Sequence, residues 1–188
     1  NLSSVSINNS SAEDQLNIVN AKINISKLKI TNAPSDAFDC DFCKGTIKNL
    51  TVMNANGDAL DISGSDLKIY GMNAKNIKDK AFSVGEKSIA YLENAAYESV
   101  STGVAVKDSS NVKLSNIYLN DVKYDSFMTY VKKPCFKGAT RLEINNYSFL
   151  GNTDIDHCVR EKGTYLKINN IDCDISKVDL EKLYQGRM

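Results

Sequence analysis

The sequence predicts an all-β protein, a parallel β-helix solenoid of about eight coils, and three observations carry this prediction. The 188-residue chain repeats itself every 22 residues. Each repeat holds two apolar positions separated by one residue, followed by an apolar triplet with the spacing i, i+3, i+5. These apolar positions alternate over short runs bounded by Asn, Gly, Ser and Asp, which is typical of strands and turns rather than helices. Such strands bury their apolar faces only when one coil stacks on the next.

The first strand of each coil is predicted by the apolar pair. Three columns align at the 22-residue spacing: a polar one with Asp14, Asp36, Asp58, Lys80, Thr102 and Tyr124, then two apolar ones with Leu16, Phe38, Leu60, Phe82 and Val104, and with Ile18, Cys40, Ile62, Val84 and Val106. Because side chains alternate along a strand, both apolar columns are expected to point into the core.

The rest of each coil is predicted by the apolar triplets. They comprise Leu2, Val5 and Ile7; Ile25, Leu28 and Ile30; Ile47, Leu50 and Val52; Ile69, Met72 and Ala74; Leu92, Ala95 and Tyr97; Leu114, Ile117 and Leu119; Ile144, Tyr147 and Phe149; and Ile168, Ile171 and Cys173. A polar column with the same spacing follows, with Asn32, Asn54, Asn76 and Asn120 and with Glu98 in the intermediate place. We predict an asparagine ladder at this corner, the alternative being the general abundance of Asn in turns.

The β-helix is expected to cover residues 1–173, with one coil extended by a loop near 131–140. Residues 174–188 are expected to form a cap on the last coil, or else a disordered tail. Because Leu2, Val5 and Ile7 read as the second half of a coil, we expect further coils or another domain N-terminal to residue 1.

Composition restricts the partners of the chain. Its 23 basic and 23 acidic residues give no net charge, so no electrostatic footprint for nucleic acid is expected. No stretch is long and apolar enough for membrane insertion. The Asn- and Ser-rich outer positions and the balanced charge favour an extracellular or cell-surface setting.

The chain contains five cysteines, so at most four can pair internally. Cys40 and Cys173 fall on inward positions and are expected to be free, whereas Cys135 and Cys158 lie in the irregular region and are the expected disulfide partners. Cys40 and Cys43 have the CxxC spacing, but no second CxxC accompanies them, and a zinc site is not expected.

Strand alternation predicts an acidic cluster on the outer face of the first strand column. If Phe38 and Cys40 point inward, Asp39 and Asp41 point outward, and Asp61 does so one coil later. Two carboxylates about 5 Å apart repel by about 1 kcal/mol in water and roughly 3 kcal/mol at an effective dielectric of 20. A bound Ca²⁺ at Asp39, Asp41 and Asp61, or one raised pKa, would relieve this repulsion, and no other cofactor is expected.

Small residues surround these acids and predict a flat outer floor. They are Ala37, Ala59, Ala81, Ser83, Gly85, Gly103 and Ala105. Beyond them lie the charged residues Lys80, Glu86, Lys87 and Lys107. A polysaccharide lying along the axis would suit this face. The predicted ligand-binding residues are Asp39, Asp41, Asp61, Ser83, Glu86, Lys87 and Lys107, and the alternative is a solvated face with ordinary turn aspartates.

The coil pattern resembles the right-handed parallel β-helix proteins of the pectin-lyase-like superfamily over nearly the whole chain. The strings SDAFDCDF at 35–42, GDALDISGS at 57–65 and DKAFSVGEKS at 79–88 are similar to β-helix modules attached to CotH-type kinase or lamin-tail-like domains of large bacterial surface proteins. The resemblance implies a bacterial surface protein and carries no activity with it. The His, Arg and Asp-Pro-His-Asp motifs of the catalytic members are missing, and the sole histidine, His157, is expected to be structural.

Two functions follow as hypotheses. The first is a non-catalytic extracellular or surface module that serves as a structural spacer, binds carbohydrate, or does both. The alternative is a polysaccharide-active enzyme, a hydrolase, lyase or epimerase, that uses Asp39, Asp41 and Asp61 as catalytic carboxylates.

Overall fold

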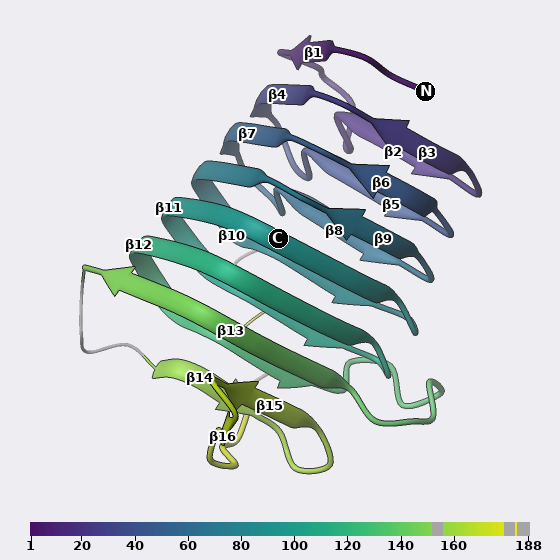
Figure 1. Cartoon of the computed structure of the whole chain (residues 1–188). Coiled ribbons are helices and arrows are strands. Elements are labelled where there is room, and N and C mark those ends of the chain that lie inside the picture. The colour runs from purple at the N-terminus through teal and green to yellow at the C-terminus, as the bar shows by residue number, and fades with distance from the viewer. Residues whose placement is uncertain (152–155, 179–182, 184–188) are drawn as a thin grey trace.

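Each repeat of the sequence forms one turn of a parallel β-solenoid with about seven turns (Figure 1). The computed structural model describes residues 1–151, 156–178 and 183. The strands in this part of the chain are β1 (Val5–Asn8), β2 (Leu16–Val19), β3 (Lys22–Ile25), β4 (Leu28–Ala33), β5 (Phe38–Asp41), β6 (Lys44–Ile47), β7 (Leu50–Ala55), β8 (Leu60–Ser63), β9 (Asp66–Ile69), β10 (Met72–Gly85), β11 (Ile89–Lys107), β12 (Asn111–Tyr130), β13 (Arg141–Leu150), β14 (Asp156–Arg160), β15 (Tyr165–Ile168) and β16 (Ile171–Asp172).

Three columns of parallel strands wrap the core. The first contains β2, β5 and β8 and continues through the ends of β10, β11 and β12 to β14. The second contains β3, β6 and β9 and continues through the starts of β11, β12 and β13 to β15. The third contains β1, β4 and β7 and continues through the start of β10, the middle of β11 and β12 and the end of β13. In Figure 1 the long strands bend around one side of the solenoid without a break.

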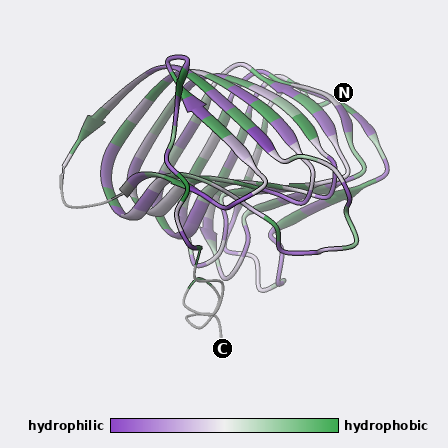
Figure 2. Ribbon diagram, turned by 90° about the horizontal axis from the view of Figure 1, so that it is seen from below, coloured by the Kyte–Doolittle hydropathy of each residue, from purple (hydrophilic) through white to green (hydrophobic). Residues whose placement is uncertain are grey.

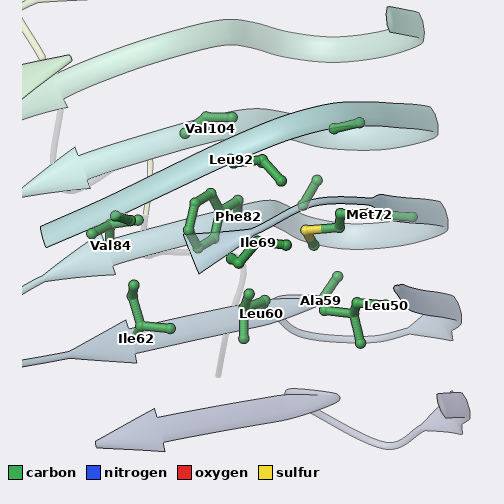
Figure 3. Close-up of a cluster of buried hydrophobic side chains, with 14 of the residues drawn as sticks. Leu50, Ala59, Leu60, Ile62, Ile69, Met72, Phe82, Val84, Leu92 and Val104 are labelled. Carbon is green, nitrogen blue, oxygen red and sulfur yellow. The ribbon is translucent and has the colours of Figure 1, made fainter. Parts of the chain in front are cut away.

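The predicted inward columns form the core. Phe38, Leu60 and Phe82 are fully buried, as are most members of the apolar triplets, and each such side chain contributes roughly 1.5–3 kcal/mol by leaving water. Figure 3 shows Leu60, Phe82 and Met72 among the side chains stacked from coil to coil. Along the ribbons of Figure 2, hydrophobic and hydrophilic segments alternate, as the strand period requires.

The number of turns is lower than the predicted eight, because the first and last triplets belong to incomplete coils. Leu2 makes only an isolated bridge to Ile25. At the other end, β16 pairs antiparallel with β15, so Ile171 turns back instead of starting another parallel coil. The predicted place of Tyr124 in the first polar column is wrong. The register shifts after Val100 and pairs Thr102 with Asp125 instead.

The asparagine ladder is present over its first members. Asn32 donates to Asn9, Asn54 to Asn32 and Asn76 to Asn54, with N···O distances of 2.8–2.9 Å. These residues have a left-handed backbone with φ near 56–59°, which Asn tolerates.

The predicted continuation of the ladder through Glu98 and Asn120 is wrong. The coil after Asn76 is one residue longer than the repeat, and Glu98 and Asn120 share the register of Lys75. Ser99 and Asp121 therefore occupy the bend, and the Ser99 hydroxyl donates to Asp121. A second asparagine stack, which joins Asn94, Asn116 and Asn146 at another corner, was not foreseen.

The predicted disulfide pairing is wrong. Cys40 bonds to Cys43, and Cys158 bonds to Cys173, whereas Cys135 is an exposed free thiol. Cys158 is the register partner of the buried Phe127, so it points inward. The chain reversal between β15 and β16 then brings Cys173 back to meet it.

The C-terminal segment returns along the outside of the first strand column. Ile175 bridges to Arg160, and Val178 and Leu183 pack against a small apolar cluster of Ala105, Met128, Tyr130 and Val159. Residues 179–182 and 184–188 of the predicted cap lie outside the described residues. Within the part of the chain that the structure describes, no helix has the length and apolar character needed to cross a membrane.

Candidate functional site

The outward positions of β5 and β8 form a group of carboxylates that we call the acid face, consisting of Asp39, Asp41 and Asp61. Asp39 and Asp61 are direct register partners on adjacent coils, and Asp41 lies two residues along the same strand as Asp39. Neighbouring parallel strands are about 4.8 Å apart, so these side chains share one surface. All three residues are partly exposed. The parity argument from the sequence therefore placed these acids correctly.

Burial and like charges raise the pKa values of two of these acids. Desolvation is the largest cause for Asp39 and, with the charges of Asp41 and Asp61, raises its pKa from 3.8 to about 7. The pKa of Asp41 is also raised, first by desolvation and then by the charges of Asp61 and Glu86. The acid face therefore contains a carboxyl group that exchanges its proton near neutral pH.

This titration gives a stability prediction. Because the folded-state pKa of Asp39 lies above its ordinary value, its contribution to stability is fully present below about pH 4 and is lost as the pH rises through about 7. Asp39→Asn removes the titrating group, so this loss does not occur in the variant. The free energy of unfolding of the variant should therefore rise relative to that of the wild type between pH 4 and 7. Solvent screening of a partly exposed group reduces the expected gain at pH 8 to about 1–2 kcal/mol.

Urea unfolding at several pH values between 4 and 8 measures this gain. Asp66→Asn, which changes an exposed carboxyl group on β9 outside the acid face, is the matched control. A difference between Asp39→Asn and the wild type that does not change with pH would contradict the prediction.

A buried lysine borders the acid face on its C-terminal side. The Lys107 side chain is only 8% exposed, and its Nζ lies 2.6 Å from Ser83 Oγ and 3.7 Å from Asp61 Oδ1. The side chain reaches back one coil across Gly85, where a Cβ would lie 2.9 Å from Lys107 Cε. The glycine thus makes room for the lysine stem, and Lys107 partly compensates the charge of Asp61.

The long loop contributes a second lysine. Lys133 forms an ion pair with Glu86, and the hydrogen bond with Glu86 is the main cause of its raised pKa. The loop is held in place because the backbone amides of Lys132 and Lys133 donate to Asp108 Oδ1 at 2.8 and 2.6 Å. Glu86 and Lys133 both act electrostatically on Asp41, so the loop end borders the acid face.

The predicted flat floor of small residues is wrong. Ala37, Ala59 and Ala81 are fully buried within the main core, because they lie at the corner where the chain enters the first strand column. Ser83, Gly85, Gly103 and Ala105 are also buried. Ala105 belongs to the cluster on which Val178 and Leu183 pack. The open part of the outer face is therefore confined to the coils of β2, β5 and β8.

A second group of acids lies at the corner before the acid face. Carboxylate oxygens of Asp36, Asp58 and Asp61 lie within 4.8 Å of one another, which is close enough to share a cation. Asp36 Oδ1 accepts the backbone amide of Asp58 at 2.6 Å, and Asp58 Oδ1 accepts that of Lys80 at 2.9 Å. The buried Lys80 ammonium lies 3.4 Å from Asp58 Oδ1 and 2.8 Å from Asp79 Oδ1.

This corner is a less favourable Ca²⁺ site than its acid count indicates. Ca²⁺ takes roughly six to eight oxygen ligands, whereas oxygens of Asp36 and Asp58 already accept backbone amides and Lys80 already supplies positive charge. Among the described acids of this corner, the buried oxygen without a hydrogen-bond partner is Asp61 Oδ1, which lies 3.7 Å from Lys107 Nζ. A Ca²⁺ ion at the predicted residues Asp39, Asp41 and Asp61 remains a prediction.

Most of the predicted site residues lie together. Contacts or register connect Asp39, Asp61, Ser83 and Lys107, and electrostatic coupling links Asp41 to Glu86. Lys87 is exposed in the turn after β10 and forms no ion pair with the described part of the chain. Sequence reasoning missed Lys133, because nothing in the repeat relates an insertion of variable length to a particular coil.

His157 has structural surroundings. Its ring is half-buried and packs edge-on against Phe149, with 4.6 Å between the ring centroids. It lies on β14, at the far end of the first strand column from the acid face.

Comparison of the sequence with protein-family models finds no match, and comparisons with curated proteins and with solved structures find none. The functional assignment therefore rests on the geometry of the fold and of the acid face.

Proposed function

We propose that the chain is a non-catalytic β-helix module of the pectin-lyase-like kind from an extracellular or cell-surface protein, of the type found in bacterial surface proteins. It serves as a rigid spacer and binds carbohydrate at the acid face. Rigidity is supported by coils that pair through all three strand columns and by side-chain stacks at the corners. The disulfides Cys40–Cys43 and Cys158–Cys173 suit a compartment outside the cytoplasm.

The observation that carries carbohydrate binding is the mixture of charges in the open part of the outer face. Asp39, Asp41 and Asp61 offer carboxylate acceptors to sugar hydroxyl groups, while Lys107 and the Glu86–Lys133 pair border them. A small number of polar and charged groups at a binding surface fix the orientation of a ligand. Because the coils after β10 are covered on this face, the ligand would contact three coils rather than the whole length of the solenoid.

Affinity electrophoresis through gels that contain neutral or acidic polysaccharides tests this proposal. The wild type should be retarded by at least one polysaccharide, and Asp39→Asn/Asp61→Asn should lose the retardation. Asp66→Asn/Glu143→Gln removes two carboxylates from the second strand column and is the control for charge. Retardation that is identical in all three proteins with every polysaccharide that retards the wild type would refute binding at the acid face.

A polysaccharide-active enzyme is the second candidate, and one observation favours it. Asp39, with a pKa of about 7, can hold a proton at neutral pH next to Asp61, whose partner is Lys107. Two neighbouring carboxyl groups with different protonation are the arrangement that hydrolases use as acid and base. The strand spacing of about 5 Å is near the separation found in retaining glycosidases.

Turnover separates the two candidates. A hydrolase should release reducing ends, a lyase unsaturated products, and an epimerase should change the ratio of sugar epimers in the polymer. Asp39→Asn should abolish the reaction while keeping the fold and the binding. A binding module should show no product with wild type or variant, even when affinity electrophoresis detects binding.

A further inference from the structure

A groove of about 770 Å³ runs along the solenoid at the bend of the third strand column, on the strands β7, β10, β11 and β12. It crosses four consecutive coils, so its first and last coils are about 14 Å apart. The chain is irregular at this point, since the register shifts between Ile77 and Lys80 and again between Val100 and Thr102. Such bulges alter the curvature of a sheet and are frequent beside binding sites. The groove precedes the Asp58 corner and is distinct from the acid face.

One wall of the groove is the bend itself and consists of short polar side chains. They are Asn54, Asn76, Ser99 and Asp121, which share the left-handed backbone of the ladder. The ladder amides end here, because Asn76 donates to Asn54 but the next coil offers Ser99 instead of another Asn. The wall therefore presents amide, hydroxyl and carboxylate groups that can bind hydroxyl groups of a ligand.

The other wall contains the cations. Its residues follow the register partners Ala55, Ile77, Val100 and Val122 by one position, and they are Asn56, Lys78, Ser101 and Lys123. Lys78 and Lys123 are exposed, and neither forms an ion pair in the described ranges. Lys123 lies over the Tyr124 ring, with its Nζ 4.7 Å from the centroid. Two coils separate the lysines, which places their backbones about 10 Å apart.

We propose that this groove binds an acidic polysaccharide that carries one anionic group per disaccharide. The coil spacing is close to the length of one sugar unit in an extended glycan, so successive units would meet equivalent positions on successive coils. The lysines occupy alternate coils, with the neutral Ser101 between them, and therefore match an anionic group on every second sugar. Asn56 would bind hydroxyl groups of the units between. The Ser101 hydroxyl, which donates to the carbonyl oxygen of Lys78 at 2.8 Å, would accept a hydrogen bond from them.

Charge spacing distinguishes this ligand from a polymer with an acid on every sugar. In such a polymer half of the carboxylates would face Ser101 or the wall that contains Asp121, where no cation is present among the lining residues. Desolvating an unpaired carboxylate is unfavourable, so the regular polyuronate should bind more weakly. A neutral glycan would lack both ion pairs.

Calorimetric titration tests the inference with three probes of equal length: a hyaluronan hexasaccharide, hexagalacturonic acid and cellohexaose. Hyaluronan should bind most tightly, and its affinity should fall as the salt concentration rises. Lys78→Gln and Lys123→Gln should each weaken binding about two- to fivefold, the range expected for exposed ion pairs. Lys29→Gln/Lys68→Gln, which removes two exposed lysines elsewhere, should bind like the wild type.

The result does not depend on the proposed function of the acid face, because Asp39→Asn/Asp61→Asn should retain hyaluronan binding. Thermal unfolding of each lysine variant checks that the solenoid is intact. The inference is overturned if hyaluronan does not bind, if cellohexaose or hexagalacturonic acid binds equally well, or if the Lys78 and Lys123 variants bind unchanged.

Discussion

Lys80→Ala is expected to lower the free energy of unfolding by about 3–5 kcal/mol, the cost of leaving a buried charge without its partner. Lys80 is fully buried, and its ammonium group lies between Asp58, which is 2% exposed, and Asp79. Asp36 and Asp61 place two more carboxylates next to Asp58. Removing the lysine would leave this corner with buried negative charge and a cavity.

Denaturant unfolding of Lys80→Ala measures this loss. Lys75→Ala breaks an ion pair of the same chemistry with Glu98, but both side chains are about half exposed, and it should cost less than about 1 kcal/mol. Adding Asp58→Asn to Lys80→Ala should recover part of the stability, because it removes the charge that the lysine compensated. A loss of similar size for Lys75→Ala and Lys80→Ala would contradict the assigned role of burial.

Gly45→Ala is expected to cost at least about 3 kcal/mol, because backbone strain and a steric clash act together. Gly45 lies in β6 with φ at +140°, a conformation that side chains strongly disfavour. A Cβ at this position would lie 1.9 Å from the carbonyl oxygen of Ile23 on the preceding coil. That oxygen belongs to the backbone of a paired strand, so it cannot move without disturbing the stacking of the coils.

Gly163→Ala separates the two causes. Gly163 also has a positive φ, of 91°, but a Cβ there would meet nothing within 4 Å. The change should therefore cost about 1–3 kcal/mol from backbone strain alone. Equal losses for Gly45→Ala and Gly163→Ala, compared by thermal unfolding, would show that the clash with Ile23 is absent.

The solenoid could be predicted from the sequence because every coil carries apolar residues at the same positions, and these must be buried. Phe38, Leu60 and Phe82 recur at a constant spacing, and only stacked coils can bury them all. The ladder from Asn32 to Asn76 followed for the same reason. The predicted ladder extended beyond Asn76, where the real one ends. One coil is a residue longer than the repeat and places Ser99, not Glu98, at the bend, and a fixed 22-residue spacing cannot detect that shift.

The acid face followed from strand parity, which fixes the direction of Asp39 and Asp61 once their apolar neighbours are known. The segments that border and cover the outer face could not be predicted from the sequence, because they lie outside the repeat. Lys133 from the long loop forms an ion pair with Glu86, and Val178 from the C-terminal segment packs on the cluster that contains Met128. The prediction of the disulfide pairing failed for a similar reason, because Cys173 meets Cys158 only after a reversal of the chain.

Thermal-shift titration tests the central claim, ligand binding at the acid face, most directly. Ca²⁺ and then a panel of neutral and acidic polysaccharides would be added to the wild type and to Asp39→Asn/Asp61→Asn. A ligand that binds the folded state raises the melting temperature. At a ligand concentration of a hundred times Kd, it adds about 2.7 kcal/mol to the free energy of unfolding. We predict a rise in the wild type that is lost in the double variant. If every ligand that raises the melting temperature does so equally in both proteins, or if no ligand raises it, the claim is contradicted.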